Sequence, residues 1–126
     1  MAISYQDMLA AAHAVVPAVS PAEAADLVET AGALIVDVRD GTEVAASGKA
    51  KGALAVPRGS LEGRADPDSP NHNPAFRRDR PIILYCGGGA RAALAGKTLH
   101  DMGFTDVRNL GGFRDWVAGG GAVEPA

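Results

Sequence analysis

Cysteine and aromatic side chains are scarce in this sequence of 126 residues. The single cysteine, Cys86, excludes an internal disulfide, and no spacing of cysteine and histidine resembles a zinc site. Aromatic residues make up 5% of the chain against 47% hydrophobic residues, so we expect a core of aliphatic side chains and close backbone approaches. The chain length is typical of one domain, and we expect no metal and no organic cofactor.

A basic excess and long apolar runs are absent as well. The formal net charge is −3, which argues against a protein that binds nucleic acid or an anionic membrane. The first 38 residues contain no lysine or arginine, and Asp7, His13 and Pro17 interrupt any apolar run, so neither a secretory signal nor a membrane span is expected. We therefore predict a cytoplasmic protein that acts on small molecules or proteins, as a monomer by default.

Helix and strand signals alternate along the chain. The clearest boundary is at Ser20, where Glu23 completes a capping box and Pro21 suits the first turn of a helix that ends at Gly32. Residues 58–80 form a long polar connection with one helical turn near Leu61. The alternation predicts an α/β domain with a central parallel five-stranded sheet and helices on both faces. The expected strands are residues 14–19, 34–36, 53–56, 81–85 and 107–110.

The segment around Cys86 carries the strongest chemical signal. Cys86 ends an apolar strand, and three glycines, Ala90 and Arg91 follow it before a helix that we expect over residues 92–102. A strand that enters a helix through such a turn directs backbone N–H groups and the positive end of the helix dipole into one concavity, where a thiolate is stabilised. Ligands of parallel α/β folds bind at the carboxyl ends of strands, which is where Cys86 lies. The alternative is a small buried residue that ends a core strand.

Several motifs in this order resemble the rhodanese family in its single-domain form. Residues 37–39 with Glu43 are similar to the family's Asp-x-Arg-x-x-x-Glu element, and residues 48–57 to its Gly-His-Ile-x-Gly-Ala and Pro segment. Residues 103–116 follow its closing pattern of a glycine-aromatic turn, a last strand, a double glycine and Trp116. The resemblance runs from about residue 15 to 120, and we assign residues 15–124 to a rhodanese-like domain and residues 1–14 to a short helical extension.

The resemblance implies a sulfurtransferase of the thiosulfate:cyanide type. Cys86 would accept a sulfane sulfur from thiosulfate or another persulfide donor, become a persulfide, and pass the sulfur to a thiophilic acceptor. A protein persulfide is a further partner that the family suggests. The backbone N–H groups of Gly87, Gly88, Gly89, Ala90 and Arg91 would hold the transferred sulfur, and the guanidinium of Arg91 offers paired donors to an oxyanion.

Loop length separates this chemistry from its relatives. The loop from Cys86 to Arg91 has six residues, whereas the related phosphatases and arsenate reductases place five residues between the cysteine and the arginine. A six-residue loop suits a sulfur atom better than a phosphate. A cysteine-based phosphatase or arsenate reductase is therefore the minor enzymatic alternative, and an interaction or redox-sensing module without enzymatic activity is the other.

Two positions depart from the family pattern. Gly87 and Ala92 stand where many members have a basic residue and a Ser or Thr. Thiosulfate is then expected to bind less well, unless Arg58, just past the third strand, reaches the pocket instead of lying on the surface. Arg39 and Glu43 are four residues apart, and we expect them to pair across a strand-to-helix junction.

Overall fold

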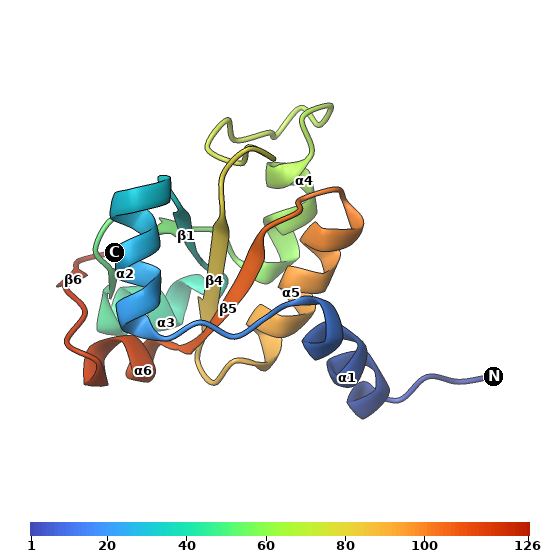
Figure 1. The fold of residues 1–126 in the computed structure, drawn as a ribbon, viewed down its shortest axis with the longest axis horizontal. Helices are drawn as coiled ribbons and strands as arrows, with labels where there is room; N and C mark the ends of the chain where they lie inside the picture. Colours follow the sequence, from blue (N-terminus) through green and yellow to red (C-terminus); the bar gives the residue numbers. More distant parts are fainter.

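A four-stranded parallel sheet lies at the centre of the computed structural model, which describes residues 1–126. Its strands follow the order β3-β1-β4-β5, and Figure 1 shows them between two groups of helices. The predicted α/β architecture is thus confirmed. The strands are β1 (Leu34–Asp37), β3 (Leu54–Ala55), β4 (Ile82–Cys86) and β5 (Val107–Gly112).

The expected strand at residues 14–19 is the one that the structure corrects. Helix α1 (Tyr5–Val15) takes up its beginning, and only Ala18 forms a single parallel bridge, to Asn109 on β5. Pro17 has no N–H to donate to a ladder, and a proline limits a segment to the edge of a sheet. The sheet therefore has four strands, with Ala18 touching its edge.

Side chains of the central strands alternate between two hydrophobic clusters, one on each face of the sheet. Val36, Leu84 and Cys86 belong to the cluster that contains residues of α4 (Leu61–Ala65) and α5 (Ala90–Asp101). Ile35 and Tyr85 belong to the other cluster, with α2 (Pro21–Ala31) and α6 (Phe113–Ala118). Because both faces are covered, β1 and β4 are buried along their whole length, as parallel strands require.

The helix ends follow the signals in the sequence. The side chain of Ser20 caps α2 by accepting from the Glu23 N–H, and Gly32 ends the helix with a left-handed φ of 64°. Helix α3 (Gly41–Ser47) and the turn η1 (Arg58–Ser60) complete the set of helices. Trp116 is buried and donates to the Ala122 carbonyl, so it anchors the packing of α6 as expected.

A second, two-stranded sheet was not predicted from the sequence. It joins β2 (Lys49–Ala50) to β6 (Val123–Glu124) in antiparallel register. The ammonium of Lys49 pairs with the carboxylate of Glu124 at 2.7 Å. This sheet ties the C-terminal residues to the segment that follows α3.

Helix α1 packs against α5 at the edge of the molecule (Figure 1). Its residue Ala12 is fully buried, while Ile3, Tyr5 and Met8 are exposed near the N-terminus. The division into an extension of residues 1–14 and a domain of residues 15–124 stays a prediction. None of the helices combines the length and apolar character needed to cross a bilayer.

Candidate active site

Cys86 is the last residue of β4, at the carboxyl edge of the sheet. Its side chain belongs to the α5 face of the core, and the residue is only 1% exposed. The backbone N–H of Gly89 donates to Cys86 Sγ at 3.0 Å. A backbone N–H in this position can donate to negative charge that develops on the sulfur during a reaction.

The glycines of the loop have separate structural roles. Gly89 has a φ of 110°, a conformation that side chains rarely adopt, and this turn brings its N–H to the sulfur. The carbonyl of Gly87 lies so close to Gly112 that a Cβ at position 112 would clash with it. Gly88 is exposed at the rim of the loop, with open space where a Cβ would be. The predicted glycine turn is therefore built on close backbone packing on one side and free space on the other.

Asn109 fixes the loop to β5, a role that the sequence did not indicate. Its side-chain nitrogen donates to the Gly89 carbonyl at 3.2 Å, and its side-chain oxygen accepts from the Gly111 N–H at 2.8 Å. The residue is buried, and a buried amide is retained where its polar atoms are satisfied. The only signal in the sequence is an asparagine that precedes Leu110 and the double glycine within the last strand.

Arg91 is held by Glu43 rather than being free at the mouth of the loop. Its two terminal nitrogens contact the two carboxylate oxygens at 2.7 and 3.1 Å, which joins the start of α5 to α3. The hydrogen bonds from Arg91 lower the pKa of Glu43, and the hydrogen bonds to Glu43, followed by its charge and that of Cys86, raise the pKa of Arg91. The expected pair of Arg39 with Glu43 is wrong, because the two side chains leave the junction in different directions.

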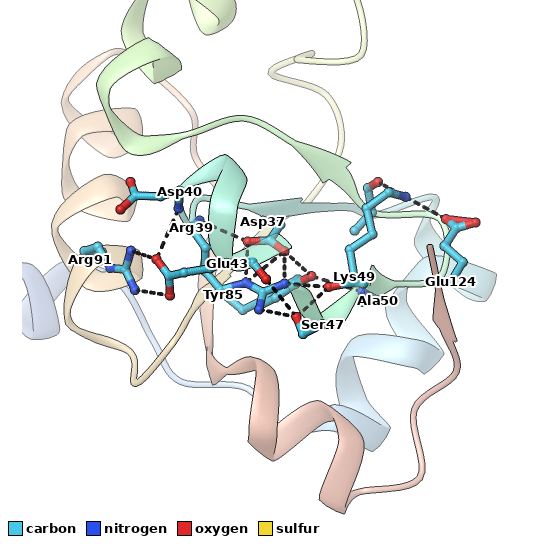
Figure 2. A network of polar contacts seen from close by, with 12 residues as sticks. Asp37, Arg39, Asp40, Glu43, Ser47, Lys49, Ala50, Tyr85, Arg91 and Glu124 are labelled. Atoms are coloured by element: carbon cyan, nitrogen blue, oxygen red, sulfur yellow. Dashed lines mark hydrogen bonds and ion pairs between the residues drawn. The ribbon is translucent and has the colours of Figure 1, made fainter. Parts of the chain in front are cut away.

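Arg39 instead belongs to a buried polar network around Asp37 and Tyr85 (Figure 2). Its guanidinium donates to both oxygens of Asp37, with a shortest distance of 2.7 Å, and to the Gly48 carbonyl at 2.8 Å. The phenol of Tyr85 donates to Asp37 at 2.6 Å and accepts from the Ala50 N–H at 3.0 Å. Burial, followed by the hydrogen bond to Asp37, raises the pKa of Tyr85, so the phenol keeps its proton. This network supports the residue directly before Cys86.

Arg58 does not join the Cys86 loop. Its guanidinium donates to Glu62 at 2.9 Å and to Thr98 at 3.0 Å. Thr98 lies eight residues beyond the start of α5, which at a rise of 1.5 Å per residue is about 12 Å along the helix. The structure thus brings together residues 86–91 and leaves Arg58 beside a different groove, between α1 and α5.

A groove of about 370 Å³ borders the loop on the side of α1. Gly88, Gly89 and Ala90 form one wall, and Leu9 and His13 of α1 form another. The remaining lining residues are Ala18, Val19, Asn109, Leu110 and Gly111. Elsewhere, no three histidine, cysteine, aspartate or glutamate side chains lie close enough together to hold a metal ion.

Comparison with known proteins identifies relatives of this chain. The family model of the rhodanese-like domain matches residues 20–119. The thiosulfate sulfurtransferase GlpE of Stutzerimonas stutzeri is 34% identical over 97 residues, which cover 76% of this chain and 81% of GlpE. The uncharacterized protein YqhL of Bacillus subtilis is 34% identical over 85 residues, 67% of this chain, and the match spans only 60% of YqhL.

A solved structure from Rhodopseudomonas palustris, RPA3614, is similar over nearly the whole chain. The TM-score is 0.88 at 37% sequence identity, covering 98% of this chain and 96% of that one. RPA3614 is described as a protein of unknown function and a possible tyrosine phosphatase. The fold, including α1, is therefore shared with a protein whose activity is open.

Proposed function

The chain belongs to the rhodanese-like domain family, and we propose that it is a sulfurtransferase that works through a persulfide on Cys86. One observation carries the proposal: Cys86 ends β4 in a six-residue loop whose Gly89 N–H donates to the sulfur. A nucleophilic thiol at a strand end, with backbone donors around it, is the arrangement that sulfur transfer needs. The relationship to GlpE supports the same chemistry.

In the first half-reaction, the Cys86 thiolate attacks the outer, sulfane sulfur of the donor. A new S–S bond forms, the donor's own bond to that sulfur breaks, and the bonding electron pair leaves with sulfite or a thiolate. The N–H of Gly89 donates to the sulfur, and in this proposal the N–H groups in the first turn of α5, which have no partner within the helix, also stabilise charge on the transferred sulfur. No redox change beyond this exchange is required.

In the second half-reaction, a thiophilic acceptor attacks the outer sulfur of the Cys86 persulfide. The S–S bond of the persulfide breaks, its electron pair returns to Cys86, and the thiolate is regenerated. Gly88 leaves the rim of the loop unobstructed for such an acceptor, since nothing occupies the space next to it. The same opening serves donor and acceptor, one after the other.

Arg91 is a positioning residue in this proposal. Because its guanidinium is bound to both oxygens of Glu43, it links the loop to α3 and fixes the start of α5 beside Cys86. Arg58 is left out of the proposed site because Glu62 and Thr98 hold it.

A phosphatase is the second candidate, and the description of RPA3614 is what favours it. Two features of this chain argue against it. The loop from Cys86 to Arg91 is shorter than the phosphatase pattern, and the arginine that would bind the phosphate is already paired with Glu43. We therefore rank phosphate hydrolysis below sulfur transfer.

The deciding experiment is the intact mass of the protein after incubation with thiosulfate or with a small organic persulfide, beside the Cys86→Ser variant. The expected result is a gain of one sulfur that cyanide removes and that the variant does not show. Hydrolysis of para-nitrophenyl phosphate is measured on the same samples. No sulfur gain from either donor, together with Cys86-dependent phosphate release, would replace the sulfurtransferase assignment by the phosphatase.

A further inference from the structure

The side-chain charges around Cys86 cancel in pairs. Arg91 is bound by Glu43 at 2.7 Å, and at the end of β1 Arg39 is bound by Asp37, also at 2.7 Å. Besides that of Glu43, the carboxylate of Asp40 is close enough to help raise the pKa of Arg91. Arg58, the other basic residue that the sequence suggested for the site, is paired with Glu62. The guanidinium groups of Arg39, Arg58 and Arg91 are therefore all engaged by carboxylates of the protein.

Position 87 is where an additional cation would enter the site. A Cβ built on Gly87 would lie 3.1 Å from a terminal nitrogen of Arg91 and 3.6 Å from a carboxylate oxygen of Glu43. A lysine or arginine at this position would thus shift the balance of that ion pair toward positive charge. With glycine there, the attraction for an anion rests on backbone N–H groups alone.

The pairing of these charges affects thiosulfate and organic persulfides differently. Attack of the Cys86 thiolate on thiosulfate brings a dianion up to an anion, and sulfite leaves as a dianion while the persulfide keeps the remaining charge. Attack on the protonated outer sulfur of an organic persulfide, RS–SH, gives the Cys86 persulfide and RS⁻, so the reacting sulfur atoms carry a single negative charge throughout. A site without a free cation favours the reaction that gathers less charge.

The groove beside the loop offers room for an organic group. Its volume of about 370 Å³ lies within the range of small-molecule sites in proteins. Leu9, Val19 and Leu110 give it apolar walls, and the exposed imidazole of His13 stands at its side. The rim residues Gly88, Gly89 and Ala90 belong both to this groove and to the loop that holds Cys86. A small inorganic anion would leave most of this space unfilled.

Building on the proposed sulfurtransferase function, we infer that the sulfur donor is the persulfide of a low-molecular-weight organic thiol, whose organic part occupies the groove between α1 and the loop, and that thiosulfate is a poor donor. The paired charges of Arg91 and Glu43, the glycine at position 87 and the apolar groove carry this inference.

The test measures the second-order rate at which Cys86 gains one sulfur, by intact mass, from thiosulfate, glutathione persulfide and the smaller 2-hydroxyethyl persulfide. We expect both persulfides to load the protein about tenfold faster than thiosulfate or more, and glutathione persulfide to exceed the smaller one because it can fill the groove. Thiosulfate loading as fast as either persulfide would overturn the inference and leave the proposed function intact. If neither these donors nor a protein persulfide transfers sulfur, the proposed function itself fails.

Variants at position 87 separate charge from the intrinsic reactivity of each donor. Gly87→Lys adds a cation, and Gly87→Gln adds a side chain of similar length without charge. The ratio of the thiosulfate rate to the glutathione persulfide rate should be roughly fivefold higher or more in the lysine variant than in the glutamine variant, as one added charge near the sulfur predicts. An equal ratio in the two variants would show that charge does not select the donor.

Variants at His13 test the groove, and because the residue is exposed, the substitutions should not disturb folding. His13→Glu should lower the rate with glutathione persulfide about fivefold relative to His13→Gln, since a carboxylate beside the groove repels the carboxylates of glutathione. Equal rates in the two variants would show that the organic part of the donor does not occupy the groove. Sulfur transfer from a protein persulfide alone, with both small persulfides inert, would overturn the donor class.

Discussion

Two arginine–carboxylate pairs lie near Cys86, and they differ in burial. The side chains of Arg39 and Asp37 are 5% and 0% exposed, whereas those of Arg91 and Glu43 are 38% and 39% exposed. Both pairs have a shortest distance of 2.7 Å. A buried charge left without its partner is costly, while a solvent-exposed pair contributes little to stability. The first pair therefore stabilises the end of β1, whereas the second can be removed with little loss of stability.

The largest effect is expected from Arg39→Met, which leaves the carboxylate of Asp37 buried without a counter-charge. The free energy of unfolding should fall by about 3–5 kcal/mol, as measured by urea denaturation. Arg91→Met is the matched control, and its loss should be several times smaller. Equal losses in the two variants would break the distinction between the buried and the exposed pair.

Tyr85→Phe removes the hydroxyl that joins Asp37 to the Ala50 N–H. Both groups then lose a hydrogen bond inside the protein, so the free energy of unfolding should fall by about 1–3 kcal/mol. Tyr5→Phe, at an exposed position of α1, is the control and should change stability little. A Tyr85→Phe protein as stable as the wild type would mean that the network tolerates the gap.

Glu43→Gln tests the exposed pair. The loss of stability should be about 0.2–1 kcal/mol, because solvent screens this ion pair. The rate of sulfur loading from thiosulfate should at the same time rise a few-fold, since Arg91 is then no longer neutralised. A loss above about 3 kcal/mol would show that the exposed pair contributes as much to stability as the buried pair, which contradicts the difference expected from their burial.

The smallest expected effect is the pH dependence of the free energy of unfolding. The Arg91 hydrogen bonds lower the pKa of Glu43 below its usual value of 4.5, so the carboxylate stabilises the fold fully above pH 4.5 and loses this contribution as the pH falls through the lowered pKa. The difference in unfolding free energy between wild type and Glu43→Gln should therefore be constant near neutral pH and shrink in acid. A difference that grows on acidification would contradict the assigned direction of the shift.

Local patterns in the sequence were sufficient for much of the fold. The capping box of Ser20 and Glu23 and the stop at Gly32 depend on residues within a few positions of one another, so spacing alone reveals them. The loop that begins at Cys86 is local in the same way, since its glycines and the following helix are contiguous. Predictions of this kind need no knowledge of which distant segments meet.

Contacts between distant segments were the ones that the sequence could not provide. Arg91 and Glu43 are 48 residues apart, and Lys49 and Glu124 are 75 apart. The expected pair of Arg39 with Glu43 assumed a helical spacing, but Arg39 precedes α3 and its side chain turns to Asp37. The groove is equally non-local, because α1, the Cys86 loop and β5 together form it. Its lining follows from how α1 packs, which no local pattern encodes.

Tyr85 and Cys86 are consecutive on β4 and face opposite sides of the sheet. A slip of β4 by one residue against its neighbours would exchange the two faces, taking the phenol away from Asp37 and the sulfur away from the Gly89 amide. The contact of Cys86 with Gly89 and the polar network can therefore form only together. A misassembled chain would lose both, so one hydrogen-bonded strand secures the stability of the domain together with the reactivity that we propose for Cys86.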